Sequence, residues 1–70
     1  MIKINGIYKH YKGHTYKVIA IAKHSETLED MVIYQALYES DFPFGQTWCR
    51  PLKMWNEIVN NVPRFQLVEN

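Results

Sequence analysis

The most strand-like segment of the chain is TYKVIAIA, residues 15–22. It is rich in β-branched and aromatic side chains, which favour extended backbone. Side chains alternate between the two faces of a strand. One predicted face carries Tyr16, Val18, Ala20 and Ala22, and the other carries Ile19 and Ile21. Apolar residues on both faces predict a central strand that bends, so that each end meets a different part of the core.

A strand is also predicted on each side of this segment. Residues 7–11 alternate and lead into residues 12–14, a short hairpin connection in which Gly13 can supply a positive φ. The polar residues 23–30 are expected to form an exposed loop, after which residues 31–38 return as a third strand. In the first strand Tyr8 and His10 are predicted to share a face, opposite Ile7 and Tyr11. In the third strand one face carries Val32, Tyr34, Ala36 and Tyr38, and the other carries Met31, Ile33 and Leu37.

The second half of the chain predicts two more strands and a helix. Residues 39–46 form an aromatic loop, and residues 47–50 form a short fourth strand that Pro51 ends. A helix is predicted over 52–59, ended by two asparagines, and a fifth strand over 64–68. The helical spacing is that of Leu52, Trp55, Ile58 and Val59, and the asparagines are Asn60 and Asn61.

This order of elements predicts a mainly β fold. Five short, mostly antiparallel strands with one short helix before the last strand match a small SH3-like five-stranded barrel. Closure into a barrel also removes exposed strand edges, which a small chain tolerates poorly. The alternative is an open antiparallel sheet with the helix packed on one face. Seventy residues allow a single domain, residues 1–70.

Composition and charge narrow the function classes. Apolar residues make up 47% and charged residues 21%, an ordinary globular composition that argues against disorder. The chain is too short for a doubly wound nucleotide-binding domain. Residues 1–24 carry a charge of +5 and the remainder −4, giving the net charge of +1. The basic first part indicates an anion-facing surface, or a charge distribution that only keeps the domain soluble.

The expected location is the cytoplasm. Cys49 is the single cysteine, so no internal disulfide can form, and a small secreted domain usually needs such cross-links. The first residues lack a long apolar stretch and a cleavage site, so no signal peptide is predicted. The longest apolar run, residues 18–22, is too short to span a membrane.

Five separated motifs resemble the domain-of-unknown-function family 1653. The resemblance runs from Gly6 to about Val68 and implies a small SH3-like β-barrel, mostly bacterial, with no established activity and no known catalytic residues. The loop FPFG at residues 42–45 is more aromatic than the resemblance leads us to expect. The five motifs are GIYKHYKG from Gly6, AKHSET from Ala22, YQALY from Tyr34, WCRPLKM from Trp48 and PRF from Pro63.

Two segments are the first candidates for a ligand face. The loop His24-Ser25-Glu26-Thr27 holds an imidazole, a carboxylate and two hydroxyls, and Trp48 and Arg50 share one face of a strand. In the alternative interpretation, Ser25 and Thr27 hold the turn, and Arg50 is an ion-pair partner of Glu26 beside a core tryptophan. Tyr8, Tyr34 and Trp48 are expected either to form an aromatic cage or to fill the core.

The leading prediction is therefore a binding or interaction module without catalytic activity, for an unknown small ligand or protein. Its predicted ligand-binding residues are His24, Ser25, Glu26, Thr27, Tyr34, Trp48 and Arg50. The alternative is nucleic-acid binding through a basic, tyrosine-rich face. Its residues would be Lys9, Lys12, Lys17 and Lys23.

Metal and thiol chemistry have little support in the sequence. A zinc site would draw on His10, His14, His24 and Cys49, but no ligand spacing typical of zinc is present, so no metal or other cofactor is predicted. A thiol enzyme would pair Cys49 with His10 or His24, and no local motif supports it. The oligomeric state is not predicted.

Overall fold

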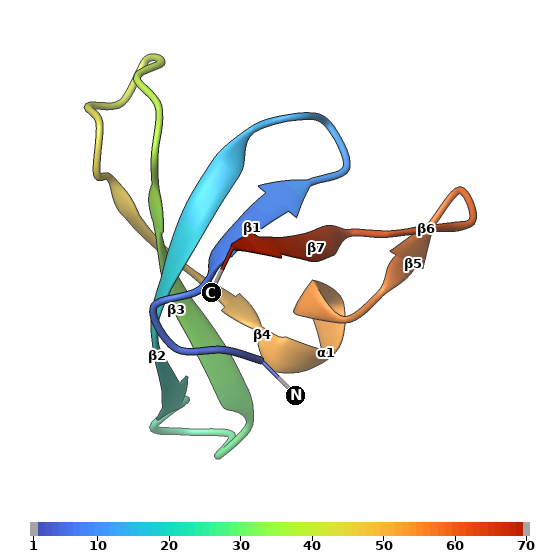
Figure 1. The fold of residues 1–70 in the computed structure, drawn as a ribbon. Coiled ribbons are helices and arrows are strands. Elements are labelled where there is room, and N and C mark those ends of the chain that lie inside the picture. Colours follow the sequence, from blue (N-terminus) through green and yellow to red (C-terminus); the bar gives the residue numbers. More distant parts are fainter. Residues whose placement is uncertain (1, 70) are drawn as a thin grey trace.

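A computed structural model describes residues 2–69, so that Met1 and Asn70 of the predicted domain lie outside the described residues (Figure 1). In chain order the elements are β1 (Ile7–His10), β2 (Thr15–Lys23), β3 (Asp30–Ala36), β4 (Thr47–Pro51), α1 (Leu52–Trp55), β5 (Ile58–Val59), β6 (Val62–Pro63) and β7 (Phe65–Glu69). No helix in residues 2–69 is long and apolar enough to cross a membrane.

Five of these strands form one antiparallel sheet in the order β4-β3-β2-β1-β7, with β2 at its centre. This confirms the predicted mainly β fold with a short helix before the last strand. Figure 1 shows the sheet curling around α1, which contacts β3 and β4. Closing it into a barrel would require β4 to pair with β7, and no such pairing is recorded within residues 2–69.

The ladder between β2 and β3 contains a bulge in β2, and bulges bend the strand that carries them. Val18 lies opposite Tyr34, but Ala20 lies opposite Ile33, so Ile19 is an extra residue in the ladder. Side chains directly opposite each other in an antiparallel pair share a face. The faces of β2 therefore exchange after Val18, and the prediction that Ala20 and Ala22 share a face with Tyr16 and Val18 is wrong.

The helix ends four residues earlier than the spacing predicts. It stops at Trp55, and Ile58 and Val59 form a strand that pairs with β6. Asn60 and Asn61 have φ of 51° and 69°, as a two-residue type I′ hairpin turn requires. The apolar residue at position 58 fitted the helical period, but its side chain is exposed. The missed signal is the asparagine pair, because asparagine tolerates positive φ better than most residues.

Arg64 holds the base of this hairpin. Its Nη2 donates to the Glu57 carboxylate at 2.8 Å, and its backbone N–H donates to the Glu57 carbonyl at 2.8 Å. Its Nε also donates to the carbonyl of Met54, at 3.1 Å. These contacts compete with any continuation of the helix beyond Trp55.

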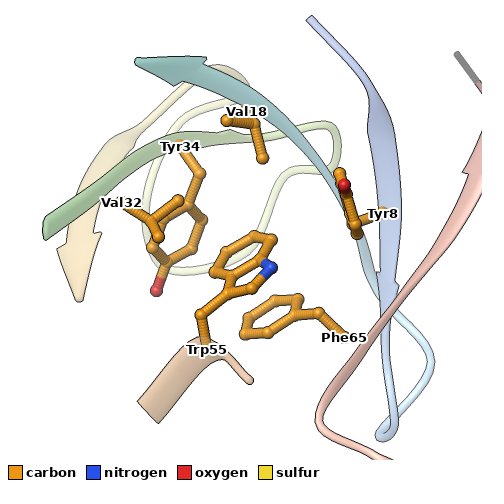
Figure 2. Packing of buried hydrophobic residues seen from close by; sticks show 6 residues of the cluster. All are labelled: Tyr8, Val18, Val32, Tyr34, Trp55 and Phe65. Atoms are coloured by element: carbon orange, nitrogen blue, oxygen red, sulfur yellow. The ribbon is translucent and has the colours of Figure 1, made fainter. Parts of the chain in front are cut away.

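The hydrophobic core lies between the sheet and α1, against what we call the inner face of the sheet (Figure 2). Trp55 is 3% exposed and lies between Tyr34 and Phe65. Its ring stacks on Phe65 with centroids 3.6 Å apart, and it meets Tyr34 edge-on at 5.0 Å. The buried residues of the core cluster are Tyr8, Val18, Val32, Tyr34, Trp55 and Phe65.

We expect Trp55→Ala to lower the free energy of unfolding by about 3–5 kcal/mol, because it removes a buried ring and leaves a cavity. Denaturant unfolding followed by circular dichroism measures the change. Met54→Ala is the matched control from the same helix, since Met54 is 38% exposed. It should cost less than about 1 kcal/mol. Equal losses in the two variants would contradict the role assigned to Trp55.

Candidate functional site

A group of aromatic and basic side chains borders the core on the inner face of the sheet. The strand register places them there: Tyr8 lies opposite Tyr16, and the His10 N–H donates to the His14 carbonyl at 2.8 Å. On the other side, Trp48 and Arg50 lie opposite Tyr34 and Val32, so they too belong to the inner face. We call the following six residues the aromatic–arginine cluster: His10, His14, Tyr16, Tyr34, Tyr38 and Arg50.

Arg50 is half-buried and is oriented by two neighbours. Its Nε donates to the Tyr34 hydroxyl at 3.3 Å, and its Cζ lies 5.4 Å from the centroid of the Phe65 ring. The ion pairs recorded within residues 2–69 join Lys23 to Asp30 and Arg64 to Glu57, and Arg50 is in neither. The guanidinium is therefore positioned without an anionic partner from residues 2–69.

Tyr16, Tyr38 and His14 form a connected edge of the cluster. The hydroxyls of Tyr16 and Tyr38 are 2.7 Å apart, and the His14 ring stacks on Tyr38 with centroids 4.0 Å apart. Burial, and then the hydrogen bond to Tyr38, raise the pKa of Tyr16. Because one of these hydroxyls donates its proton to the other, one hydroxyl proton of the pair is left for an external acceptor.

His10 lies against the edge of Phe65, with ring centroids 4.8 Å apart, and its Nδ1 accepts from the Lys12 N–H at 3.1 Å. Burial lowers the pKa of His10, and the positive charges of Arg50, Arg64 and Lys12 and the neighbouring His14 lower it further. The neutral ring then carries its proton on Nε2, since Nδ1 acts as an acceptor. This side of the cluster can offer one N–H donor.

The predicted loop His24–Thr27 is a hydrogen-bonded turn. His24 Nδ1 accepts from the N–H groups of Glu26 and Thr27, at 3.1 and 3.3 Å, and the Thr27 hydroxyl accepts from the Glu29 N–H at 3.3 Å. The alternative in which Thr27 holds the turn therefore agrees with the geometry, and His24 contributes more to the turn than was expected. Ser25 and Glu26 are exposed. Within residues 2–69, Glu26 forms no ion pair with Arg50.

The two predicted segments lie at different levels of β3. The loop joins Lys23 to Asp30, whereas Trp48 lies opposite Tyr34 and packs edge-on against Phe42, at 5.0 Å, in the connection at the other end of β3. Arg50 lies between these levels, but its guanidinium is directed to Tyr34 and Phe65. The structure thus brings Tyr34, Trp48 and Arg50 together and leaves the His24–Thr27 loop at their periphery.

A hollow of about 300 Å³ does lie beside that loop. Glu29, Asp30, Leu52, Lys53 and Asn56 line it, so it belongs to the junction of β3 and α1. Neither Arg50 nor Trp48 lines it. Participation of His24–Thr27 in a shared ligand face stays a prediction.

The predicted aromatic cage is divided between two environments. Tyr8 is buried in the core, where it meets Trp55 edge-on at 5.4 Å and its hydroxyl accepts from the Lys3 N–H at 2.9 Å. Tyr34 is also buried, although its hydroxyl reaches Arg50. Trp48 keeps a substantial exposed surface. Of the three side chains, only that of Trp48 is therefore accessible to an incoming group to any large extent.

The four lysines of the nucleic-acid alternative occupy three different places. Lys9 and Lys17 lie on the outer face, opposite to that of Tyr8 and Tyr16. Lys12 lies in the β1–β2 connection, with its Nζ 5.9 Å from the centroid of the Tyr11 ring. Lys23 pairs with Asp30 at 2.8 Å. Nucleic-acid binding stays a prediction, with Lys9 and Lys17 as its neighbouring pair.

Metal-ligating and thiol groups are dispersed. Within residues 2–69 no three His, Cys, Asp or Glu side chains gather in a way that could hold a metal ion. Cys49 is exposed and lies opposite Ile33 on the outer face, whereas His10 lies on the inner face. Cys49 and His10 therefore lie on opposite faces of the sheet.

Sequence reasoning did not place His10, His14, Tyr16 and Tyr38 in one site. The register of the β1–β2 hairpin could have indicated it, because this register places His10 beside His14 and Tyr8 opposite Tyr16. Tyr38 was assigned to the face of Tyr34, and its stacking on His14 agrees with that assignment. The step that sequence could not supply is the curl of the sheet, which brings β4 toward Phe65 of β7.

Comparison with known proteins identifies relatives without a described activity. A family model described as "Protein of unknown function (DUF1653)" matches residues 6–67. A solved structure, "Crystal structure of a protein belonging to pfam DUF1653 from Bordetella bronchiseptica", is 37% identical in sequence and superposes with a TM-score of 0.79. The match covers 93% of this chain and 86% of that chain. No curated protein matches the chain.

The environment of His10 predicts a stability loss in acid. Because its pKa is lowered from the ordinary value of 6.5, the unfolded chain binds a proton more readily than the folded protein does. The contribution of neutral His10 to the free energy of unfolding is fully present above pH 6.5. It is lost as the pH falls from 6.5 through the lowered pKa of His10 in the folded protein. Denaturant unfolding from about pH 8 to about pH 5 should therefore show a steeper loss for the native chain than for His10→Gln. Equal slopes would contradict this.

The part that Arg50 plays in lowering the pKa of His10 can be measured separately. Removing the nearby positive charge in Arg50→Gln should raise the pKa of His10, followed by the NMR signals of its ring protons. Lys53→Gln removes a charge that is not among the causes of the shift, and should leave the titration unchanged. A His10 titration that is the same in both variants would show that Arg50 does not act on it.

Proposed function

The chain belongs to the DUF1653 family of proteins of unknown function, and from its own geometry we propose that it is a small binding module without catalytic activity. The proposed ligand carries an anionic group, a carboxylate or a phosphate, that binds Arg50. Tyr34 and Trp48 complete the proposed ligand face with the rest of the aromatic–arginine cluster.

We further propose that the fold is an SH3-like barrel. Support comes from the strand order, in which β1 lies between β2 and β7, and from the helical turn α1, which precedes the last part of the chain. The curl of the sheet around α1 is also typical of such barrels (Figure 1). In this arrangement α1 and Trp55 fill the space between β4 and β7.

The observation that carries the functional proposal is that Arg50 is half-buried and that its guanidinium has no carboxylate partner within residues 2–69. Partly burying an unpaired charge costs free energy, and a carboxylate or phosphate can offset that cost. The Tyr34 hydroxyl accepts from Nε, and the two terminal nitrogens have no recorded hydrogen bond within the described residues. A guanidinium in this state favours bidentate contact with a planar or tetrahedral anion.

The side chains around Arg50 also favour a ligand with an anionic group. His10 and His14 contribute imidazole rings, and the hydrogen-bonded pair of Tyr16 and Tyr38 hydroxyls has one further proton to donate. The exposed ring of Trp48 offers a surface on which a planar part of the ligand can pack. No carboxylate belongs to the cluster as defined.

We expect Arg50→Gln to weaken the binding of inorganic phosphate and of benzoate by about tenfold or more, because it removes a charge-assisted hydrogen bond. NMR chemical-shift titration measures both affinities in the folded variants. Arg50→Lys keeps the charge without the planar fork, and should bind with intermediate affinity. Lys53→Ala removes an exposed lysine of α1 and should bind as the native chain does.

The same titration separates the remaining alternatives. His24→Gln should lower affinity only if the loop takes part in the ligand face. Single-stranded oligonucleotide binding that survives in Arg50→Gln and is lost in a Lys9→Ala, Lys17→Ala double variant would favour the nucleic-acid alternative. Phosphate and benzoate binding that is unchanged in Arg50→Gln would contradict the proposed function.

A further inference from the structure

A second surface, apart from the proposed anion site, lies on the connection between β3 and β4. Phe42 and Phe44 in this connection are 49% and 64% exposed. We call these two rings the aromatic loop patch. Large apolar side chains that are exposed together are typical of interaction sites, because their transfer out of water favours association.

The loop that carries the patch is internally hydrogen-bonded. The Gly45 N–H donates to the Ala36 carbonyl at 2.9 Å, the Gln46 N–H donates to the Pro43 carbonyl at 3.1 Å, and the Ala36 N–H donates to the Gln46 carbonyl at 2.9 Å. Phe42 is also held edge-on against Trp48, with centroids 5.0 Å apart. The rings are thus presented by an ordered loop, which lowers the entropic cost of binding through them.

Charge identifies the kind of surface that this loop fits. Residues 37–49 contain Glu39 and Asp41, both exposed, and no lysine or arginine. A complementary surface would therefore combine positive charge with an apolar or aromatic group.

The chain itself carries such a surface on its β1–β2 hairpin. Lys9 and Lys12 are exposed there, and the Nζ of Lys12 lies 5.9 Å from the centroid of the exposed Tyr11 ring. This hairpin and the β3–β4 connection lie at the same end of the molecule (Figure 1). His14 stacks on Tyr38, and the Leu37 N–H donates to the Thr15 carbonyl at 3.0 Å, so the two segments are in direct contact.

We propose that two copies of the chain associate about a two-fold axis. In each half of the contact, the aromatic loop patch of one copy packs on Tyr11 of the second copy, and Glu39 and Asp41 face Lys9 and Lys12. A two-fold contact requires a surface that is complementary to itself, and the acidic and basic segments satisfy this requirement because they are neighbours on one end. The proposal does not depend on the anion site.

A charge-exchange experiment tests this arrangement. Sedimentation equilibrium from about micromolar to about millimolar protein should show a monomer–dimer equilibrium for the native chain. The acidic-to-basic variant, Glu39→Lys with Asp41→Lys, and the basic-to-acidic variant, Lys9→Glu with Lys12→Glu, should each be monomeric through repulsion. An equimolar mixture of the two should form a mixed dimer, because both halves of the contact are then attractive again.

Two further variants test whether the apolar rings stabilise the dimer and whether any change of surface charge would disrupt it. Phe44→Ser should weaken the dimer about tenfold or more, since it removes the most exposed ring of the patch. Lys53→Glu changes the same kind of charge on α1 and should leave the dimer intact. Circular dichroism confirms that each variant is folded. A native chain that is monomeric throughout, or a variant mixture that stays monomeric, would overturn the proposal.

Discussion

The stacking of Trp55 on Phe65 is the contact on which the rest of this structure depends. Trp55 comes from a four-residue helix that has little stability of its own, and Phe65 opens the last strand. Their rings lie 3.6 Å apart and nearly parallel. Phe65 also touches His10, Tyr16 and Tyr34 and lies below the guanidinium of Arg50. The core and the candidate site therefore share one ring, so a change in the core also reaches the site.

The parts of the fold that sequence predicted are those set by local patterns. Alternation located β1, β2 and β3, and it correctly placed Val32, Tyr34 and Ala36 on one face of β3, which is the buried one. The predictions failed where one residue interrupts a period. The extra residue at Ile19 exchanges the faces of β2, and the asparagine pair after Val59 converts a predicted helix into a hairpin.

The candidate site was predictable only in part, for a related reason. Trp48 and Arg50 could be placed on a common face, because their separation along a strand settles it. The association of Arg50 with Phe65, and of His14 with Tyr38, depends on how far the sheet curls, and no local pattern encodes that curvature. The His24–Thr27 loop shows the opposite case. Its polar groups suggested a ligand, but backbone N–H groups occupy His24 Nδ1 and the Thr27 hydroxyl.

The strand order also bears on how the chain folds. Three of the four pairings in the five-stranded sheet join strands that are consecutive in sequence, and only β1 with β7 joins the two ends of the chain. Closing that long loop costs conformational entropy before any contact rewards it. A meander of β1 to β4 can form first, and the last strand then docks as α1 folds against it. The pairing of β7 with β1 would then be the rate-limiting step of folding.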